Sequence, residues 1–484
     1  MLFSLLLLFA TPVSEDTPAT DKSATEPTAT EKSPAAAAKS VQPVEQPNPE
    51  SPTLLSPITR ALSLRPQTAV LENGLTVVLH EDHRSPIINL TTLVRVGSAD
   101  DPPDASGLAH LFEHLMFKGS PNAPGADWGR LLEEAGAESK AWTERDWTIY
   151  QTTGPSSSLE RLLFLESDRL GWMPESLSDD IIQKERLVID NERAARKGGD
   201  DSALFSTLHQ LLWPEGHPYH RPVLGLDDHQ ESLTIGHIVQ LFGSHYRPSN
   251  AIVVITGDFE RSATLELAKA HFGLIENRGA RALRPYADSP RRDNDVRIKW
   301  VVSGGAPLLS LGWNTPPWGH PDLPKLRLAA EILRARCNAL PHVAYNAPPK
   351  VALRSRRAGG ELVFQLVSDG SDLDTLLKAF DAQLNDLAMN GPSQTELDHA
   401  RMRWQAKSLE ALEDLDSIGL ALARCSAVHE EADCTGPEMA AVEQVTPQQV
   451  QAAIRTHLQQ NRVLLSRVSE KQADLALENA EDYQ

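Results

Sequence analysis

His110, Glu113 and His114 are the residues of this 484-residue chain whose types and spacing point most directly to chemistry. The two histidines stand four positions apart within Gly107–Gly119, a stretch whose apolar residues recur at helical spacing. Residues four apart on a helix project from the same face, so both imidazoles could bind one metal ion. Glu113 lies beside them, where a carboxylate can reach a water on that ion without being a ligand.

The H-x-x-E-H pattern of these residues is the inverted form of the zinc-protease helix motif. So short a pattern also arises by chance, and two surface histidines beside a carboxylate on a solvated helix explain it equally well. The motif alone therefore leaves a metal site and an ordinary helix face as equal interpretations, and the flanking sequence has to decide between them.

The overall composition narrows the class of protein. Hydrophobic residues make up 40% of the chain and charged residues 23%, as in soluble globular proteins, and the length predicts two to four domains. The formal net charge of −20 argues against nucleic acid as the main partner. It favours neutral or basic substrates, or it serves the solubility of an exported protein.

The N-terminal residues predict export, to the periplasm or out of the cell. Met1–Ala10 is an apolar run, too short to span a bilayer but long enough for a signal-peptide core, which we assign to residues 1–14. Residues 15–62 are rich in Pro, Ala, Thr and Ser and predict a disordered linker. No later stretch is long and apolar enough for a transmembrane helix.

The three cysteines are Cys337, Cys425 and Cys434, and none stands in a C-x-x-C pair. Cys425 and Cys434 are close enough in sequence for a local disulfide in an oxidising compartment. Isolated buried thiols are an equally good interpretation.

Strands and helices are predicted to alternate around the motif through about residue 275. An Asn73-Gly74 turn should join the first two strands. We expect strands at 68–71, 75–80, 86–96, 141–150 and 251–256, and helices at 128–135, 158–172 and 178–197. A charged, Pro-containing linker is predicted at Glu276–Asp295.

The pattern then restarts, because residues 85–90 resemble residues 306–311 and a helix follows each. When the two helices are aligned, all three motif residues are replaced: His110 is matched by Ala330, Glu113 by Leu333 and His114 by Arg334. The sequence therefore predicts an internal duplication with one metal-binding half and one inert half.

Several separate blocks of the chain resemble the insulinase/pitrilysin-type metallopeptidases, especially the two-domain group that includes the mitochondrial processing peptidase and its bacterial relatives. Besides the motif helix, these blocks are Leu71–Leu75, Glu166–Arg169, Asn191–Arg193, His217–Tyr219 and Tyr246–Asn250. The resemblance implies an α+β fold of two similar α/β-sandwich halves, each a mostly antiparallel sheet with helices, that form a clamshell after a disordered N-terminal segment.

The resemblance also sets the expected domains. They are a catalytic peptidase domain at 63–280, a shortened second domain of the same fold without a metal site at 281–470, and an acidic tail at 471–484.

In this family the third zinc ligand is a Glu within a block like Glu-Arg-x-Val-x-x-x-Glu on a later helix, here residues 185–192. By resemblance Glu192 completes the site for one Zn²⁺ per chain, and Glu185 joins Glu113 in catalysis by orienting a ligand. Glu185 and Glu192 share a helix face, whereas Asp190 lies about 160° around the helix from Glu192.

The resemblance implies peptide-bond hydrolysis. Two imidazoles and one carboxylate leave a fourth zinc position for a water, whose pKa falls toward about 7. Glu113 is then the general base, which takes a proton from the water and returns it to the leaving amine.

Lys140, Ala141, Trp142 and Thr143 resemble the family's edge strand, which binds an extended substrate by β-augmentation. The family usually has Asn-Ala where this chain has Lys140-Ala141, and Lys cannot accept a hydrogen bond as an amide can. We therefore expect altered substrate positioning. An ordinary sheet strand is an equally good interpretation of the same residues.

We predict an exported zinc metalloendopeptidase that acts on peptides or unfolded polypeptide segments. In the family an Arg and a Tyr from the second half, or from a partner chain, help to hold the substrate, and we assign no such pair here. The alternative is a weakly catalytic or non-catalytic interaction subunit of the same fold that works with a homologous partner chain or as a dimer.

Overall fold

The computed structural model describes residues 64–196, 201–278, 292, 294–429, 431–460 and 462–482. The predicted signal segment at 1–14 and the linker at 15–62 lie outside these residues, as does most of the linker predicted at Glu276–Asp295. Across the described ranges, no helix has the length and apolar character needed to cross a membrane.

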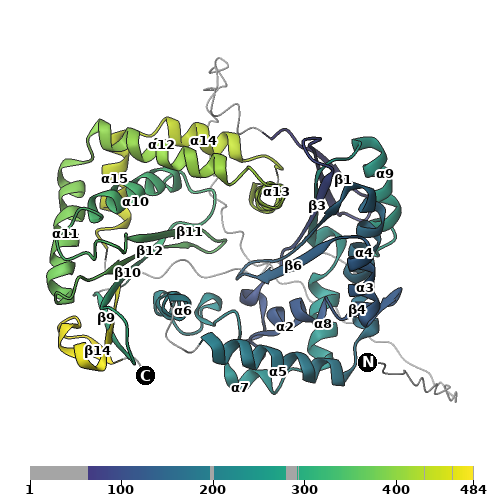
Figure 1. Ribbon diagram of the computed structural model, residues 1–484, viewed down its shortest axis with the longest axis horizontal. Helices are drawn as coiled ribbons and strands as arrows, with labels where there is room; N and C mark the ends of the chain where they lie inside the picture. The colour runs from purple at the N-terminus through teal and green to yellow at the C-terminus, as the bar shows by residue number, and fades with distance from the viewer. Residues whose placement is uncertain are drawn as a thin grey trace, which may run out of the picture. The chain divides into compact units, whose positions relative to one another are not determined.

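The first half is built on a mixed sheet with the strand order β1-β2-β8-β3-β7-β6 (Figure 1). Its strands are β1 (Gln67–Val70), β2 (Thr76–Glu81), β3 (Ile87–Val94), β6 (Glu138–Thr143), β7 (Thr148–Pro155) and β8 (Ala251–Gly257). The predicted hairpin around Asn73-Gly74 is confirmed as the antiparallel pair β1–β2. The β2–β8 pair is parallel and the remaining pairs are antiparallel.

One face of this sheet shares a hydrophobic core with the helices of the first half, including the motif helix α2. These helices are α2 (Leu108–Leu115), α3 (Ala126–Glu134), α4 (Leu159–Trp172), α5 (Asp179–Arg196), α8 (Ile235–His245) and α9 (Arg261–Phe272). Short elements between them are β4 (Gly119–Ser120), β5 (Ala123–Pro124), α7 (Asp227–Gln230) and single 3-10 turns. Side chains alternate across the sheet: Val77 and Leu79 enter this core, whereas Val78 faces the opposite side.

The second half has its own mixed sheet, in the order β11-β12-β10-β13-β9-β14. Its strands are β9 (Val296–Val302), β10 (Leu308–Thr315), β11 (Lys350–Arg354), β12 (Gly360–Val367), β13 (Val463–Ser469) and β14 (Glu481–Asp482). Its helices are α10 (Leu323–Cys337), α11 (Leu373–Asn390), α12 (Gln394–Glu410), α13 (Leu415–His429), α14 (Thr435–Glu443) and α15 (Pro447–His457).

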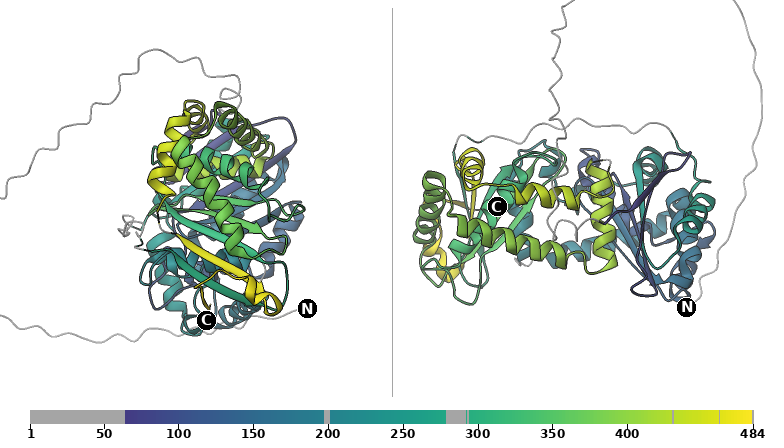
Figure 2. Two further views of the ribbon diagram at one scale, coloured as in Figure 1. Left: turned by 90° about the vertical axis from the view of Figure 1, so that its left-hand side faces the viewer. Right: turned by 90° about the horizontal axis from the view of Figure 1, so that it is seen from above.

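The two halves repeat one topology, which confirms the expectation of two similar sheet-and-helix halves. The run β9-β13-β10-β12-β11 has the same order and strand directions as β2-β8-β3-β7-β6, including one parallel pair. The outermost strands differ, because β14 is parallel to β9 whereas β1 is antiparallel to β2. Figure 2 shows the sheets and helices of the chain from two further sides. Residues 470–482, which we expected to be part of an acidic tail from 471, form a 3-10 helix (Glu470–Leu475) and this strand.

Each half lends one helix to the other half's sheet. Helix α13 of the second half packs on the free face of the first sheet, and α6 (Asp201–Leu212) of the first half packs on the second sheet (Figure 1). Glycines allow the close approach: a Cβ at Gly419 of α13 would lie 2.5 Å from Thr91 Oγ1, and one at Gly312 of β10 would lie 3.1 Å from Leu212 Cδ1. Both sheets are therefore buried on both faces.

Two expectations for the secondary structure were wrong. The single strand predicted at 141–150 is a hairpin, in which Glu144–Trp147 turn the chain between β6 and β7. The turn is held by tertiary contacts, since Asp146 accepts a hydrogen bond from the hydroxyl of Tyr219. The motif helix is also shorter than Gly107–Gly119, because its regular turns end at Leu115.

Of the two interpretations of the cysteines, the structure has the disulfide. Cys425 and Cys434 are bonded, with their Cα atoms 5.3 Å apart, and Cys337 is a buried free thiol. The bond joins α13 to the start of α14.

Candidate metal centre

Helix α2, which carries the motif, is fixed at its start by a buried carboxylate. Asp101 accepts hydrogen bonds from the N–H groups of Gly107 (2.7 Å) and Ala109 (2.9 Å). These are among the backbone donors that a helix N-terminus leaves without an intrahelical partner. Burial raises the pKa of Asp101 to about 7, against the opposing effect of the two hydrogen bonds.

Three donor atoms from α2 and α5 converge at one point. The Nε2 atoms of His110 and His114 lie 3.6 Å and 3.7 Å from the same carboxylate oxygen of Glu192, and the two imidazole rings are 4.7 Å apart. All three ligand atoms lie within 4.8 Å of one another. The side chain of His110 is 8% exposed and that of Glu192 is 30% exposed, so the site opens on the Glu192 side.

Glu185 contacts the opposite edge of the His114 ring. One of its oxygens lies 3.5 Å from His114 Nδ1, and the other lies 2.7 Å from the ammonium of Lys118. Burial acts to raise the pKa of Glu185, but the hydrogen bonds from His114 and Lys118 outweigh it and the pKa is lowered. An ionised Glu185 can therefore hold His114 with its Nε2 atom turned toward Glu192.

Glu113 lies between the two histidines and the edge strand of the sheet. Its side chain is buried, and its Oε2 atom accepts a hydrogen bond of 2.6 Å from the hydroxyl of Thr143 in β6. Burial raises the pKa of Glu113, and the Thr143 hydroxyl opposes that shift. Asp190 is not part of the cluster, because it is half-exposed and pairs with Arg193.

The four residues expected to bind substrate all lie on β6, which is an edge strand of the first sheet. Ala141 and Thr143 face α2, whereas Lys140 and Trp142 face α13. The ammonium of Lys140 lies 2.6 Å from a carboxylate oxygen of Asp416. Lys140, which departs from the family's pattern, thus forms an ion pair with a residue of the second half.

Sequence reasoning missed Asp101, Lys118 and Asp416. Asp101 and Lys118 flank the motif, but the hydrogen bonds of Asp101 reach six and eight residues ahead, which no capping pattern indicates. Asp416 stands 276 residues from Lys140, so no local signal could have paired them.

Comparison with known proteins identifies the family of this arrangement. A family model described as insulinase, peptidase family M16, matches residues 76–225, and a model described as the peptidase M16 inactive domain matches residues 232–403. The zinc protease PqqE of Helicobacter pylori is 26% identical over 368 residues, which cover 73% of this chain and 81% of that protein.

A probable mitochondrial-processing peptidase subunit beta of Schizosaccharomyces pombe is 28% identical over 53% of this chain and 56% of its own length. The crystal structure of a protease from Helicobacter pylori superposes with a TM-score of 0.75 at 21% identity, over 84% of this chain and 99% of that one. With the fold, the two consecutive family models and the H-x-x-E-H helix in agreement, this chain belongs to peptidase family M16.

Proposed function

We propose that this chain is a zinc-dependent peptidase that hydrolyses peptides or unfolded polypeptide segments. The observation that carries the proposal is the convergence of two imidazoles and one carboxylate beside Glu113, at the edge strand β6. The names of the relatives point the same way, since one of them is a zinc protease.

The donor set fits zinc. Structural and catalytic zinc sites use imidazole nitrogen and carboxylate oxygen, and three protein ligands leave room for a water or a substrate. His110, His114 and Glu192 would hold the ion, and their ligand atoms already lie within 4.8 Å of one another. A zinc ion held there supplies a Lewis acid, which lowers the pKa of a water and polarises a peptide carbonyl.

Glu113 does the proton transfer in this proposal. It accepts a proton from the attacking water and donates it to the amine that leaves when the peptide bond breaks. Its burial and its raised pKa suit a group that must both accept and release a proton. The Thr143 hydroxyl holds the carboxylate in place, next to the strand on which the substrate would lie.

The substrate would bind as an added strand on β6. An edge strand offers a row of backbone N–H and C=O groups that an extended peptide can pair with. Such pairing needs an unfolded segment, and it recognises backbone rather than sequence, so specificity has to come from the side-chain pockets beside the strand.

The second candidate function is an interaction subunit that works with a homologous chain. It is favoured by the similarity to a protein named as a subunit of a processing peptidase. Export is proposed separately, on the apolar run Met1–Ala10 and on the disulfide between Cys425 and Cys434, which is typical of an oxidising compartment.

The test combines metal analysis of the purified chain with a library of quenched fluorescent peptides. We expect about one zinc per chain, as in three-ligand catalytic sites, and cleavage that a chelator abolishes. Bound zinc without cleavage, both alone and with a homologous partner chain, would instead identify the inert subunit.

A further inference from the structure

The edge strand β6 presents two different faces to a substrate. Thr143 bonds to Glu113 on the face toward α2, whereas Lys140 and Trp142 contact α13 on the other face. A peptide that pairs with β6 has the same two-residue alternation. Every second side chain of the substrate therefore points toward α13, away from the reacting groups.

A cavity of about 410 Å³ lies on that second face, between β6 and the start of α13. Trp142 and Leu420 form an apolar part of its wall, and Asp414, Asp416 and Lys140 add charges. The wall is thus shared between the two halves, with the substrate strand on one side and α13 on the other.

The two carboxylates of this cavity differ in how their charge is balanced. One oxygen of Asp416 is paired with the ammonium of Lys140, and its other oxygen accepts hydrogen bonds from Asn89 and Thr153 of the first sheet. Asp414 accepts only neutral donors among its described contacts, the backbone N–H and the hydroxyl of Ser417. Asp414 is exposed at the start of α13, so its carboxylate is solvated and can be reached by a cation that enters the cavity.

We propose that this cavity is a specificity subsite that takes a Lys or Arg side chain of the substrate; the inference rests on the proposed function. The aliphatic stem of such a side chain covers Trp142 and Leu420, and its cation reaches Asp414. Lys140 stands three residues from Thr143, about 10 Å along a strand, so the preferred residue lies within about three positions of the cleaved bond.

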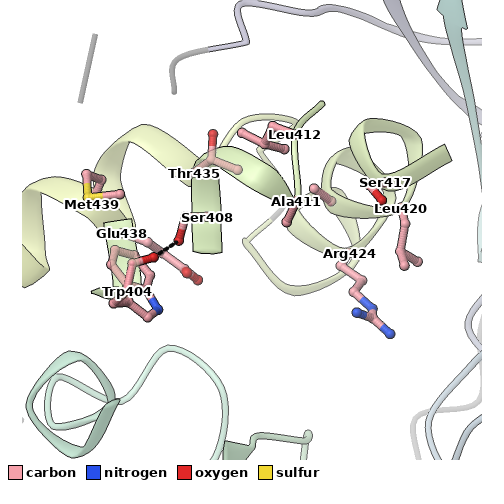
Figure 3. Close-up of a pocket in the computed structure, with 11 residues that line it drawn as sticks. Trp404, Ser408, Ala411, Leu412, Ser417, Leu420, Arg424, Thr435, Glu438 and Met439 are labelled. Atoms are coloured by element: carbon pink, nitrogen blue, oxygen red, sulfur yellow. Dashed lines mark hydrogen bonds between the residues drawn. The ribbon is translucent and has the colours of Figure 1, made fainter. Parts of the chain in front are cut away.

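A neighbouring cavity of about 270 Å³ suits a different side chain (Figure 3). It lies between α12, α13 and α14, and it shares Ser417 and Leu420 with the first cavity. Its wall includes Trp404 and Met439, and the guanidinium of Arg424 also borders it. Glu438 lines the same pocket, and the charges of Arg424 and Glu438 are paired with Glu144 and Arg327. The subsite for Lys or Arg is therefore assigned beside β6, where Asp414 accepts only neutral donors among its described contacts.

The experiment measures binding and cleavage of peptides that differ only at one position, which carries Lys, Gln, Leu or Glu. Cleavage is measured with the zinc-loaded wild-type chain, and affinity is measured by fluorescence anisotropy on the Glu113→Gln variant, which keeps the subsite. We expect Lys to be preferred over Gln about two- to five-fold at one position, the range of an exposed ion pair. The flanking positions should show no such preference, because their side chains point to the other face.

Two substitutions should move this preference in opposite directions. Asp414→Asn keeps the cap of α13 but removes the charge, and it should bring the Lys-to-Gln ratio to about one. Lys140→Gln removes the competing cation and should raise the ratio. Asp372→Asn, which alters the cap of α11 in the same way, is the matched control and should leave the ratio unchanged.

The outcomes separate this inference from the proposed function. Cleavage without a Lys preference, a preference for Leu at this position, or a preference that survives in Asp414→Asn and in Asp414→Ser overturns the subsite and leaves the peptidase intact. A Lys preference in binding without any cleavage supports the subsite and contradicts the peptidase. Absence of binding and cleavage for every peptide contradicts both.

Discussion

The helix pair that carries the proposed metal site in the first half has a counterpart in the second half with different charged side chains. Helices α10 and α12 occupy the same places in the element order of the second half as α2 and α5 do in the first half. Where α2 and α5 bring two imidazoles toward Glu192, α10 and α12 meet through Glu331, which bonds to Lys407 and Arg334 and lies 3.7 Å from Arg403. The matched positions Leu333 and Arg334 carry no ligand.

The difference shows that the fold places two helices against each other in both halves, whereas the side chains at the crossing determine whether a cation can bind there. In both halves the crossing of the two helices gathers charged groups. At the second crossing Glu331 is surrounded by the cationic side chains of Arg334, Arg403 and Lys407. Burial acts to raise the pKa of Glu331, but its hydrogen bonds to Lys407 and Arg334 outweigh burial and the pKa is lowered. At the first crossing the carboxylates of Glu113, Glu185 and Glu192 come together around the two imidazoles, and Lys118 pairs with Glu185. A divalent cation would balance that charge, whereas the second crossing needs none.

The largest expected effect separates Glu185, Asp190 and Glu192, three of the acidic residues of α5. Glu192→Gln should weaken zinc binding by orders of magnitude, because it removes a ligand atom. Glu185→Gln should largely retain zinc but lose activity about 10- to 100-fold, as expected for a group that orients a ligand. Asp190→Asn, on another face of the same helix, is the control. Zinc content and peptide cleavage are measured on all three, and zinc lost from the Asp190 variant would contradict the helix register.

Zinc should raise the stability of the folded chain. Binding to the native state alone adds about 2.7 kcal/mol to the free energy of unfolding at a hundredfold excess over Kd. Thermal unfolding with zinc and with a chelator should therefore differ by several degrees in the wild-type chain. The difference should largely disappear in Glu192→Gln. An equal zinc effect in both proteins would place the stabilising ion elsewhere.

The contacts of the two exchanged helices with the sheets should differ in their tolerance of an added methyl group, which Gly419 of α13 and Gly312 of β10 test. Gly419→Ala drives a Cβ against Thr91 and Asn89, whose side chains are already hydrogen-bonded to each other, so overpacking should cost about 1–3 kcal/mol. Gly312→Ala meets the flexible end of Leu212, and its cost should be smaller. Denaturant unfolding measures the loss in free energy of unfolding for each variant. The opposite ranking would contradict the packing of α13 on the first sheet.

The smallest effect concerns the ion pairs of the second half. Glu331→Gln should destabilise the chain by about 1 kcal/mol at neutral pH, the upper end for an exposed ion pair, because Lys407 is largely exposed. The pKa of Glu331 is lowered in the folded state, so its contribution is present above about pH 4.5 and is lost as the pH falls below that value. Urea unfolding at neutral and acidic pH should show that the free energies of unfolding of the wild-type chain and of Glu331→Gln become equal as the pH falls. Zinc content should not change, and Glu410→Gln, on the exposed end of α12, is the control.

Local patterns predicted the elements that carry the site, but not the contacts between the halves. The helical spacing around His110 and His114, the Asn73-Gly74 hairpin and the helix of Glu185 and Glu192 are all encoded within short segments. The turn at Glu144–Trp147 was missed because Thr and aromatic residues stand on both sides of it, although Glu144, Arg145 and Asp146 interrupt them. That turn depends on distant partners, since Trp147 stacks on Trp318 of the second half, with ring centroids 4.5 Å apart.

The exchange of α6 and α13 lay beyond sequence reasoning for a similar reason. An amphipathic pattern predicts that a helix has an apolar face, but not which sheet covers that face. The same limit applied to Lys140. Its departure from the family's pattern was visible, whereas its partner Asp416 became visible only when α13 was placed on the first sheet.

The most direct test of the account is Glu113→Gln, assayed for zinc content and peptide cleavage on the same preparation. Glu113 moves the proton and holds no metal in this account, so the variant should keep about one zinc per chain. Its cleavage rate should fall by roughly 100-fold or more, the usual contribution of a general base. A variant that keeps zinc and cleaves peptides at a near-normal rate would contradict the proposed mechanism.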